Sequence, residues 1–190
     1  YEKPQRGRLR EHWQLNVDVF GISDMSAEHE LILLTDSIMR EFKATRDMYE
    51  IKLNSRKLMD FIMKDYLGLD NVQTHTLSKL IDRMHKIDRS TFVAGTDALL
   101  RPTQRDAGLS QKLLDILAVK NIDDLPTQIL ESGVFDNLKS LIELLKDNGV
   151  SNIEFDISIM RGFDYYTDIV FEMNDTDPEN NRAMMGGGRY

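Results

Sequence analysis

The sequence predicts an α+β fold, in which an antiparallel β-sheet is flanked by helices and carries a mainly helical insertion. Two observations lead to this prediction. Apolar and polar residues alternate near both ends of the chain, as in strands, while the middle shows helical spacing without convincing strands. The chain has 190 residues, 41% of them hydrophobic, which suffices for one packed domain with an insertion. We therefore expect a first core part at residues 1–67, a helical subdomain at 68–133 and a second core part at 134–190.

The composition excludes several classes of protein. There is no Cys, so disulfides and thiol-bound metal are excluded, and a reducing compartment is favoured. The chain shows neither an apolar run long enough to span a bilayer nor a signal peptide, so we expect a cytoplasmic protein without membrane contact. The formal net charge is -8, which means that any attraction to nucleic acid needs a local basic patch.

The first core part opens with a loop and a strand. Proline and glycine lie among the charges of residues 1–11, which is typical of a loop. The next residues alternate, so a strand is expected, and its polar face is either solvated or the floor of a ligand site. Its apolar side comprises Trp13, Leu15, Val17 and Val19, and its polar side comprises His12, Gln14, Asn16 and Asp18.

A turn, a helix, a strand and a second helix should complete this part. The turn covers residues 21–25, and Ser26 is expected to cap the first helix. The second helix covers residues 56–66 and stops near Gly68. The first helix should face the core with Leu31, Leu34, Ile38 and Phe42, and the strand after it alternates at Tyr49, Ile51 and Leu53.

The insertion should consist of short helices. Lys79, Arg83 and Lys86 form a basic stripe on one expected helix, and this stripe is either a solvated face or a contact for a nucleic-acid backbone. The apolar face of that helix comprises Leu77, Leu80, Ile81, Met84 and Ile87, a loop is expected around residues 101–108, and further short helices at 113–117 and 124–131.

The second core part surrounds an unusual stretch, Arg161 to Thr167, which reads RGFDYYT. An arginine offers a fork of donors that suits carboxylate or phosphate, and tyrosine offers a flat apolar face with a polar tip. The stretch is therefore either a pocket for a small ligand with an anionic end or a hairpin turn with a surface arginine. A helix at residues 135–145, strands at 153–159 and 169–173, and a glycine run at 186–188 surround it.

Three separated segments together resemble one known family. Glu2 to Gln14 resembles the second signature motif of class II aminoacyl-tRNA synthetases in its histidyl-tRNA synthetase form. Arg161 to Thr167 resembles the first histidine-specific motif of that family, and Gly186 to Tyr190 resembles the second. The three motifs occur in the family's order, with a helical insertion between the first and second, and the match covers essentially the whole chain.

The resemblance implies both a fold and a reaction. It implies the class II catalytic core with an insertion, and the formation of histidyl-adenylate and pyrophosphate from histidine and ATP. Histidine then passes to the 3′ end of tRNA(His). The implied partners are histidine, ATP with Mg²⁺ on its phosphates, tRNA(His) and a second copy of the full-length protein, and no metal bound by the protein itself is implied.

The resemblance also assigns roles residue by residue. Arg161 is the implied catalytic residue, lying near the histidine carboxylate and the α-phosphate. The implied histidine-binding residues are Gln14, Asp18, Tyr165, Tyr166, Gly187 and Tyr190. The implied ATP-binding residues are Glu2, Arg8, Arg10 and Arg161, and the candidates for tRNA contact are Arg6, Arg8, Lys79, Arg83 and Lys86.

Some positions depart from the family pattern. Asp18 stands where the family usually has Glu, and Phe163 replaces a common Leu. The family's first and third motifs and its anticodon-binding domain have no counterpart here, so we expect the chain to be cut from a longer protein. Two related non-enzymes share the fold: the regulatory subunit of ATP phosphoribosyltransferase and the tRNA-sensing region of a stress kinase. Both tend to lose motif residues, whereas this chain retains Arg8, Gln14, Arg161, Tyr166 and the glycine run, which favours the enzyme.

Overall fold

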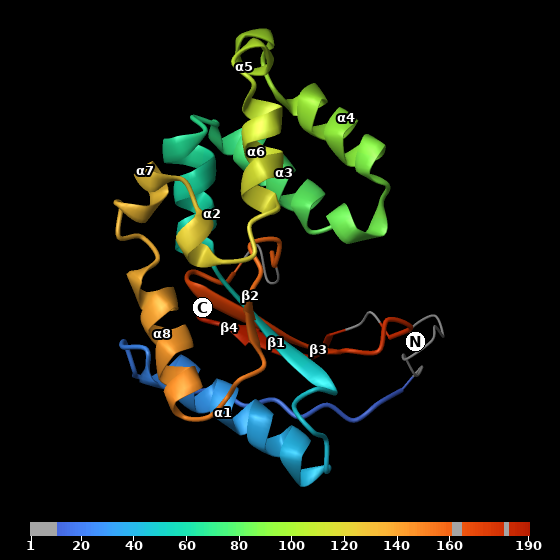
Figure 1. The fold of residues 1–190 in the computed structure, drawn as a ribbon, viewed down its shortest axis with the longest axis vertical. Helices are drawn as coiled ribbons and strands as arrows, with labels where there is room; N and C mark the ends of the chain where they lie inside the picture. The colour runs from blue at the N-terminus through green and yellow to red at the C-terminus, as the bar shows by residue number, and fades with distance from the viewer. Residues whose placement is uncertain (1–10, 161–164, 181–182) are drawn as a thin grey trace.

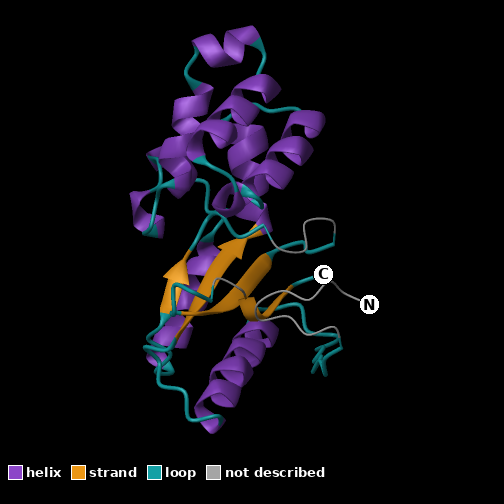
Figure 2. Cartoon of the chain, turned by 90° about the vertical axis from the view of Figure 1, so that its right-hand side faces the viewer, coloured by secondary structure: helices purple, strands orange, loops and turns teal. Residues whose placement is uncertain are grey.

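The computed structural model describes residues 11–160, 165–180 and 183–190. Figure 1 shows a sheet in the lower half of the molecule, with helices below it and a block of short helices above it. Figure 2, turned by 90°, shows the same separation of the sheet from the upper helices. None of the helices in the described ranges is both long and apolar enough to cross a membrane.

The sheet has the strand order β2-β1-β3-β4. The β1–β3 and β3–β4 pairs are antiparallel, while β1 and β2 are parallel, so the α+β prediction is confirmed with a mixed sheet in place of a wholly antiparallel one. The parallel pair is possible because the upper helices and α8 form the long crossover that parallel strands need. The strands are β1 (Tyr49–Ser55), β2 (Ile153–Phe155), β3 (Ile169–Asp175) and β4 (Ala183–Gly188).

In Figure 1, α1 (Ser26–Glu41) lies below the sheet and α8 (Asp136–Asp147) lies to its left, and the two helices contact each other. The helix predicted at residues 135–145 is confirmed as α8. It ends at Asp147 and is capped by Asn148, and the next residue, Gly149, has a φ of 82° that favours glycine. The upper helices, called here the helical block, are α2 (Arg56–Phe61) with η1 (Ile62–Tyr66), α3 (Asn71–Ile81), η2 (Met84–Lys86), α4 (Arg89–Leu99), α5 (Pro102–Asp106), α6 (Leu109–Leu117), η3 (Ile122–Asp124) and α7 (Thr127–Leu130).

The core-facing side of α1 differs from the prediction. Leu34 and Phe42 are exposed, at 38% and 82% of their surface, whereas the buried positions are Ala27, Glu28, Ile32 and Asp36. Two of these are acids, which hydrophobic periodicity assigns to solvent. Ser26 is the first helical residue and makes no side-chain cap; its N–H instead donates to Asp24 Oδ1 at 2.8 Å.

Asp36 shows why an acid lies on the buried side of α1. Arg46 donates to both of its oxygens, at 3.2 and 2.9 Å, and the Tyr49 hydroxyl at the start of β1 donates to Oδ1 at 2.5 Å. Burial disfavours the charged form, but the bonds from Arg46 and Tyr49 and the nearby positive charges outweigh it and hold the pKa of Asp36 below its usual value. This network ties α1 to β1.

The strand expected at residues 12–19 is not formed. Trp13 is fully exposed and Leu15 is 75% exposed, so the predicted apolar face points to solvent. A strand needs a partner for its backbone N–H and C=O groups, and in the part of the chain that the structure describes no strand pairs with this segment. The polar side chains bond locally instead, with Gln14 Nε2 donating to Asn16 Oδ1 at 3.1 Å.

The basic stripe of the insertion is not one helix face. Lys79 lies in α3, which ends at Ile81, while Arg83 and Lys86 belong to the separate turn η2 and its cap. The loop expected at residues 101–108 contains the short helix α5, and α4 has no predicted counterpart. The strand expected at 153–159 stops at Phe155, and residues 156–160 form a buried irregular loop.

Candidate active site

The glycine run 186–188 forms the last part of the edge strand β4, and Gly187 and Gly188 face aromatic rings. Gly187 pairs with Phe171 of β3, and a Cβ added at Gly187 would lie 2.9 Å from a Phe171 ring carbon. A Cβ at Gly188 would lie 2.8 Å from two ring carbons of Tyr166. Real side chains do not tolerate such distances, so both positions require glycine for close packing of the rings.

The two segments that resemble histidine-specific motifs meet at this edge of the sheet. The Thr167 N–H donates to the Arg189 carbonyl at 2.7 Å, and the Arg189 N–H donates to the Ile169 carbonyl at 3.0 Å. Tyr165 and Tyr166 lie with their ring centroids 4.3 Å apart, tilted by 59°. Tyr165 is 60% exposed, so its ring is accessible from solvent. The described part of the first motif thus forms an aromatic wall against the second.

Asp18 reaches the same place from the N-terminal segment. The Tyr190 hydroxyl donates to Asp18 Oδ1 at 3.1 Å, and the Phe20 ring meets the Tyr190 ring edge-on, with centroids 6.5 Å apart. Partial desolvation and the bond to Asp18 raise the pKa of Tyr190 above its usual value, so the hydroxyl remains a donor at neutral pH. The structure therefore brings together Asp18, Tyr165, Tyr166, Gly187 and Tyr190 around the end of β4.

Arg189 holds that arrangement in place, and sequence reasoning gave it no role. Its guanidinium donates to both carboxylate oxygens of Glu28, to the Ile22 carbonyl at 3.1 Å and to the Asp24 carbonyl at 2.7 Å. The bond to Glu28 raises the pKa of Arg189 further. This contact fixes the start of α1 against the end of β4. The sequence carried no signal for this contact, because Glu28 is an ordinary acid in the first turn of a helix and its partner lies 161 residues away.

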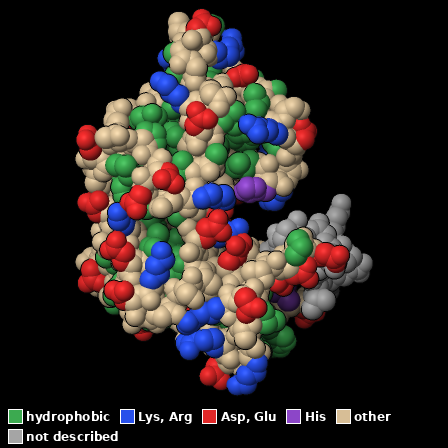
Figure 3. Space-filling view, viewed as in Figure 1, with side chains coloured by type: hydrophobic (Ala, Val, Ile, Leu, Met, Phe, Trp, Pro, Cys, Tyr) green, Lys and Arg blue, Asp and Glu red, His purple; other side chains and the backbone are tan. Residues whose placement is uncertain are grey.

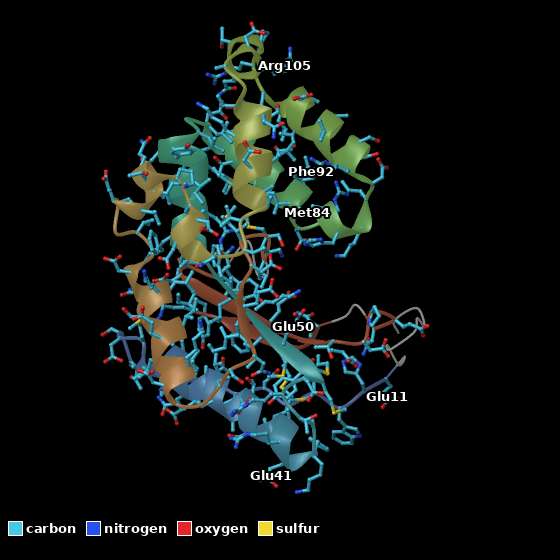
Figure 4. All side chains as sticks on the ribbon, viewed as in Figure 1. Glu11, Glu41, Glu50, Met84, Phe92 and Arg105 are labelled. Atoms are coloured by element: carbon cyan, nitrogen blue, oxygen red, sulfur yellow. The ribbon has the colours of Figure 1, made fainter. Side chains whose placement is uncertain are left out.

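The other predicted residues lie elsewhere. Gln14 is exposed and bonds to Asn16, and among the described residues no contact places it beside the tyrosines. Lys79, Arg83 and Lys86 belong to the lower part of the helical block, where Figure 4 labels Met84. Figure 3 shows a hollow on the right of the molecule beneath this part, bordered by Lys or Arg, Asp or Glu and His side chains. Glu2, Arg6, Arg8, Arg10 and Arg161 lie outside the described residues.

A polar link joins the helical block to the loop that precedes Arg161. His85 Nε2 lies 2.9 Å from Ser158 Oγ, and that hydroxyl donates to Asp156 Oδ1 at 2.5 Å. Asp156 and Ser158 are both buried, at 8% exposure, whereas His85 is exposed. This hydrogen bond connects η2 to the loop 156–160, which directly precedes the first histidine motif.

The cavity and the groove found in the described residues lie apart from this site. A small apolar cavity lies between helices of the helical block. An open groove of about 270 Å³ lies along β2 and α8. None of the predicted histidine-binding residues lines either of them. Within the described ranges, no group of three or more His, Asp or Glu side chains is placed to hold a metal ion.

The fold is that of a synthetase catalytic core. Histidyl-tRNA synthetase from Nostoc sp. PCC 7120 superposes with a TM-score of 0.70 at 23% identity, over 86% of this chain and 39% of that one. A protein from Bacillus halodurans, described as an ATP phosphoribosyltransferase regulatory subunit/histidyl-tRNA synthetase, also gives 0.70, at 18% identity over 90% of this chain and 44% of that one. At these identities the likeness establishes the fold alone.

Sequence similarity establishes the family. The family model described as histidyl-tRNA synthetase matches residues 1–190. Histidine–tRNA ligase of Leptospira biflexa is 38% identical over 191 residues, and that of Thermoplasma volcanium is 34% identical over 190. The chain belongs to the histidyl-tRNA synthetase family. All of it aligns with these two relatives, but it spans only 43% of the length of each.

Proposed function

We propose that this chain is the catalytic-core part of a histidine–tRNA ligase. The enzyme activates histidine with ATP and transfers it to the 3′ end of tRNA(His). The observation that carries the proposal is the meeting of the two histidine-specific motifs at the end of β4, where Thr167 bonds to Arg189 and Tyr166 packs on Gly188. Asp18 reaches the same place through Tyr190.

The arrangement suits a small zwitterionic substrate with an imidazole ring. The Asp18 carboxylate would receive the α-ammonium of histidine, and Tyr165 and Tyr166 would offer flat faces and hydroxyls to the imidazole. Gln14 would add an amide, and Gly187 would let the substrate lie close to β4. A site that hydrogen-bonds both imidazole nitrogens rejects analogues that lack them, because its own polar groups would lose their partners.

Arg161 is the residue proposed to act on the reacting atoms. A histidine carboxylate oxygen attacks the α-phosphorus of ATP, a new O–P bond forms, and pyrophosphate leaves. Both reactants are anions, so a positive charge fixed between them lowers the barrier. Mg²⁺ carried on the ATP phosphates supplies further positive charge.

The remaining assignments complete the proposal. Residues 68–133 act as a helical insertion between two parts of the catalytic core, 1–67 and 134–190, and the full-length protein is a homodimer in the cytoplasm. Glu2, Arg8 and Arg10 contact ATP. The residues proposed to contact tRNA(His) are Arg6, Arg8, Lys79, Arg83 and Lys86.

A non-catalytic role is the second candidate, and the fold gives a specific reason to test it. The ATP phosphoribosyltransferase HisG:HisZ complex from Thermotoga maritima contains a chain that superposes with a TM-score of 0.59 at 16% identity. The fold thus also occurs in an assembly of another kind. The relatives at 34% and 38% identity, in contrast, are both histidine–tRNA ligases, which favours the enzyme.

The test is Arg161→Ala in the full-length protein. We expect histidine-dependent ATP–pyrophosphate exchange to fall by at least about a hundredfold, since a lost charge at the reacting centre typically costs that much. Circular dichroism should remain unchanged. Lys112→Ala, which removes an exposed charge from α6, is the control and should retain full exchange. Unchanged exchange in Arg161→Ala would refute the catalytic role, and a wild-type protein without exchange would support the non-catalytic candidate.

A further inference from the structure

Four consecutive residues, Asn54 to Lys57, comprise the last two residues of β1 and the first two of α2. The sheet ladder between β1 and β3 ends with the pair Ser55 and Ile169. Apart from this ladder, the four residues contact the segments on both sides of the first histidine motif. These contacts are made mostly by side chains. This segment is called the β1–α2 run below.

On the N-terminal side of the motif, Asn54 holds the irregular loop 156–160. Its side chain is fully buried, and Nδ2 donates to the Ile157 carbonyl at 2.9 Å and to the Ile159 carbonyl at 3.0 Å. Its Oδ1 accepts from the Ser55 N–H at 2.8 Å. Buried backbone carbonyls outside regular structure need partners, and one amide group supplies two of them here. The guanidinium of Arg56 adds a contact to Met160 Sδ at 3.8 Å.

On the C-terminal side, the next three residues hold Asp168. The Ser55 hydroxyl donates to Asp168 Oδ1 at 3.0 Å, and Lys57 Nζ lies 2.6 Å from Oδ2. The Arg56 N–H donates to the Asp168 carbonyl at 2.8 Å. Asp168 is only 6% exposed, so these bonds satisfy a carboxylate that is otherwise removed from water.

We propose that the β1–α2 run is a positioning element for the catalytic step, because it fixes Met160 and Asp168, the residues on either side of the motif that contains Arg161 and the two tyrosines. The chemistry in this inference rests on the function proposed above. Asn54 is the decisive residue, since its amide bonds to loop carbonyls and not to the β1–β3 ladder. The residues of the run touch no proposed substrate group and act only through the motif.

A positioning role predicts a specific kinetic signature. A displacement of about 1 Å in a reacting group costs on the order of a hundredfold in rate. A loss of position at the motif should therefore lower kcat for histidine-dependent exchange more than it raises KM for histidine or ATP.

The first test replaces Asn54 with Asp in the full-length protein, which keeps the volume but removes both donors. We expect kcat to fall by about 10- to 100-fold while KM changes by less than about threefold. Asn152→Ala is the matched control, because Asn152 Nδ2 also donates to a backbone carbonyl, Tyr49 at 2.9 Å, but at the opposite end of β1. An equal loss in both variants would overturn the proposal, as would a change confined to KM.

A milder variant keeps the test decisive if Asn54→Asp fails to fold. Lys57 is 57% exposed, so Lys57→Met removes its contact to Asp168 without emptying the core. We expect kcat to fall by about 3- to 10-fold in Lys57→Met, and Lys57→Arg to restore most of it. Normal kcat in Lys57→Met would remove the C-terminal half of the proposal.

A third measurement does not depend on catalysis. Hydrogen–deuterium exchange followed by mass spectrometry should show faster exchange in the peptides covering 156–160 and 165–168 in Asn54→Asp, and wild-type exchange there in Asn152→Ala. If the wild-type protein shows no histidine-dependent activity, the proposed function fails while this measurement still decides the structural role. Unchanged deuterium uptake at both ends of the motif would overturn the inference.

Discussion

Residues 11–20 and strand β3 carry the same kind of pattern but have different structures. Trp13, Leu15 and Val17 alternate with polar residues, as do Phe171 and Met173 of β3, yet only β3 is a strand. β3 bonds to β1 on one side and to β4 on the other, and it is largely buried. Alternation thus tells which side of a strand is apolar, but a backbone partner decides whether the strand exists.

The largest effect should come from the well-paired region. Ile51 of β1 is fully buried between Ile153 of β2 and Met173 of β3 in the sheet register. Ile51→Ala should lower the free energy of unfolding by about 4 kcal/mol, because it removes buried apolar volume that neighbours cannot refill. Urea unfolding followed by circular dichroism measures this. A loss below about 1 kcal/mol would mean that the centre of the sheet is far less tightly packed than described.

The next effect concerns the attachment of α1 to the sheet. Asp36→Ala leaves Arg46 and the buried Tyr49 hydroxyl without their shared partner, so unfolding should become easier by about 3 kcal/mol. Asp115→Ala, which removes an exposed acid from α6, is the control and should change little. Equal stability of the two variants would contradict a buried anchor at Asp36.

The same anchor should depend on pH. The pKa of Asp36 is depressed in the folded protein, so its stabilisation is complete above the ordinary value of 3.8 and is lost as pH falls toward the folded value. The stability difference between wild type and Asp36→Ala should therefore be large at about pH 6 and shrink below about pH 4. A difference that grows in acid would reverse the sign and refute the depressed pKa.

The smallest effect should come from the unpaired segment. Trp13 is fully exposed, so Trp13→Ser should change the unfolding free energy by no more than about 0.5 kcal/mol, despite the size of the side chain. The same urea experiment compares it directly with Ile51→Ala. A loss above about 2 kcal/mol would show that residues 11–20 are packed in solution and would remove the contrast between the two regions.

The sequence predicted the fold best where a local pattern coincides with burial. The alternation at Tyr49, Ile51 and Leu53 and the spacing in α8 both identified their elements. Helix α4 was missed because its buried positions are few, with Phe92 and Thr96 as the fully enclosed ones. The predicted orientation of α1 was wrong because two acids lie on its buried side. Glu28 pairs with Arg189, 161 positions away, and Asp36 pairs with Arg46, which lies beyond the end of the helix, so the apolar spacing within α1 indicates neither pair.

The residues of the candidate site were also predicted only in part. Resemblance indicated the tyrosines, the glycines and Asp18, and the structure brings these residues to one end of β4. Residues that hold the site, such as Asn54 and Arg189, were not predicted to have a role. Their partners lie more than 100 positions away in the sequence, and a single sequence does not show such pairs.

The contact between Arg189 and Glu28 also has a consequence for the order of folding. It joins residues 161 positions apart, so the start of α1 cannot be fixed against the end of β4 until Arg189 has been synthesised. Most contacts in the helical block, such as those between α3 and α4, join near neighbours in the sequence and close small loops. The helical block is therefore able to form before the edge of the sheet that carries the histidine motifs is completed.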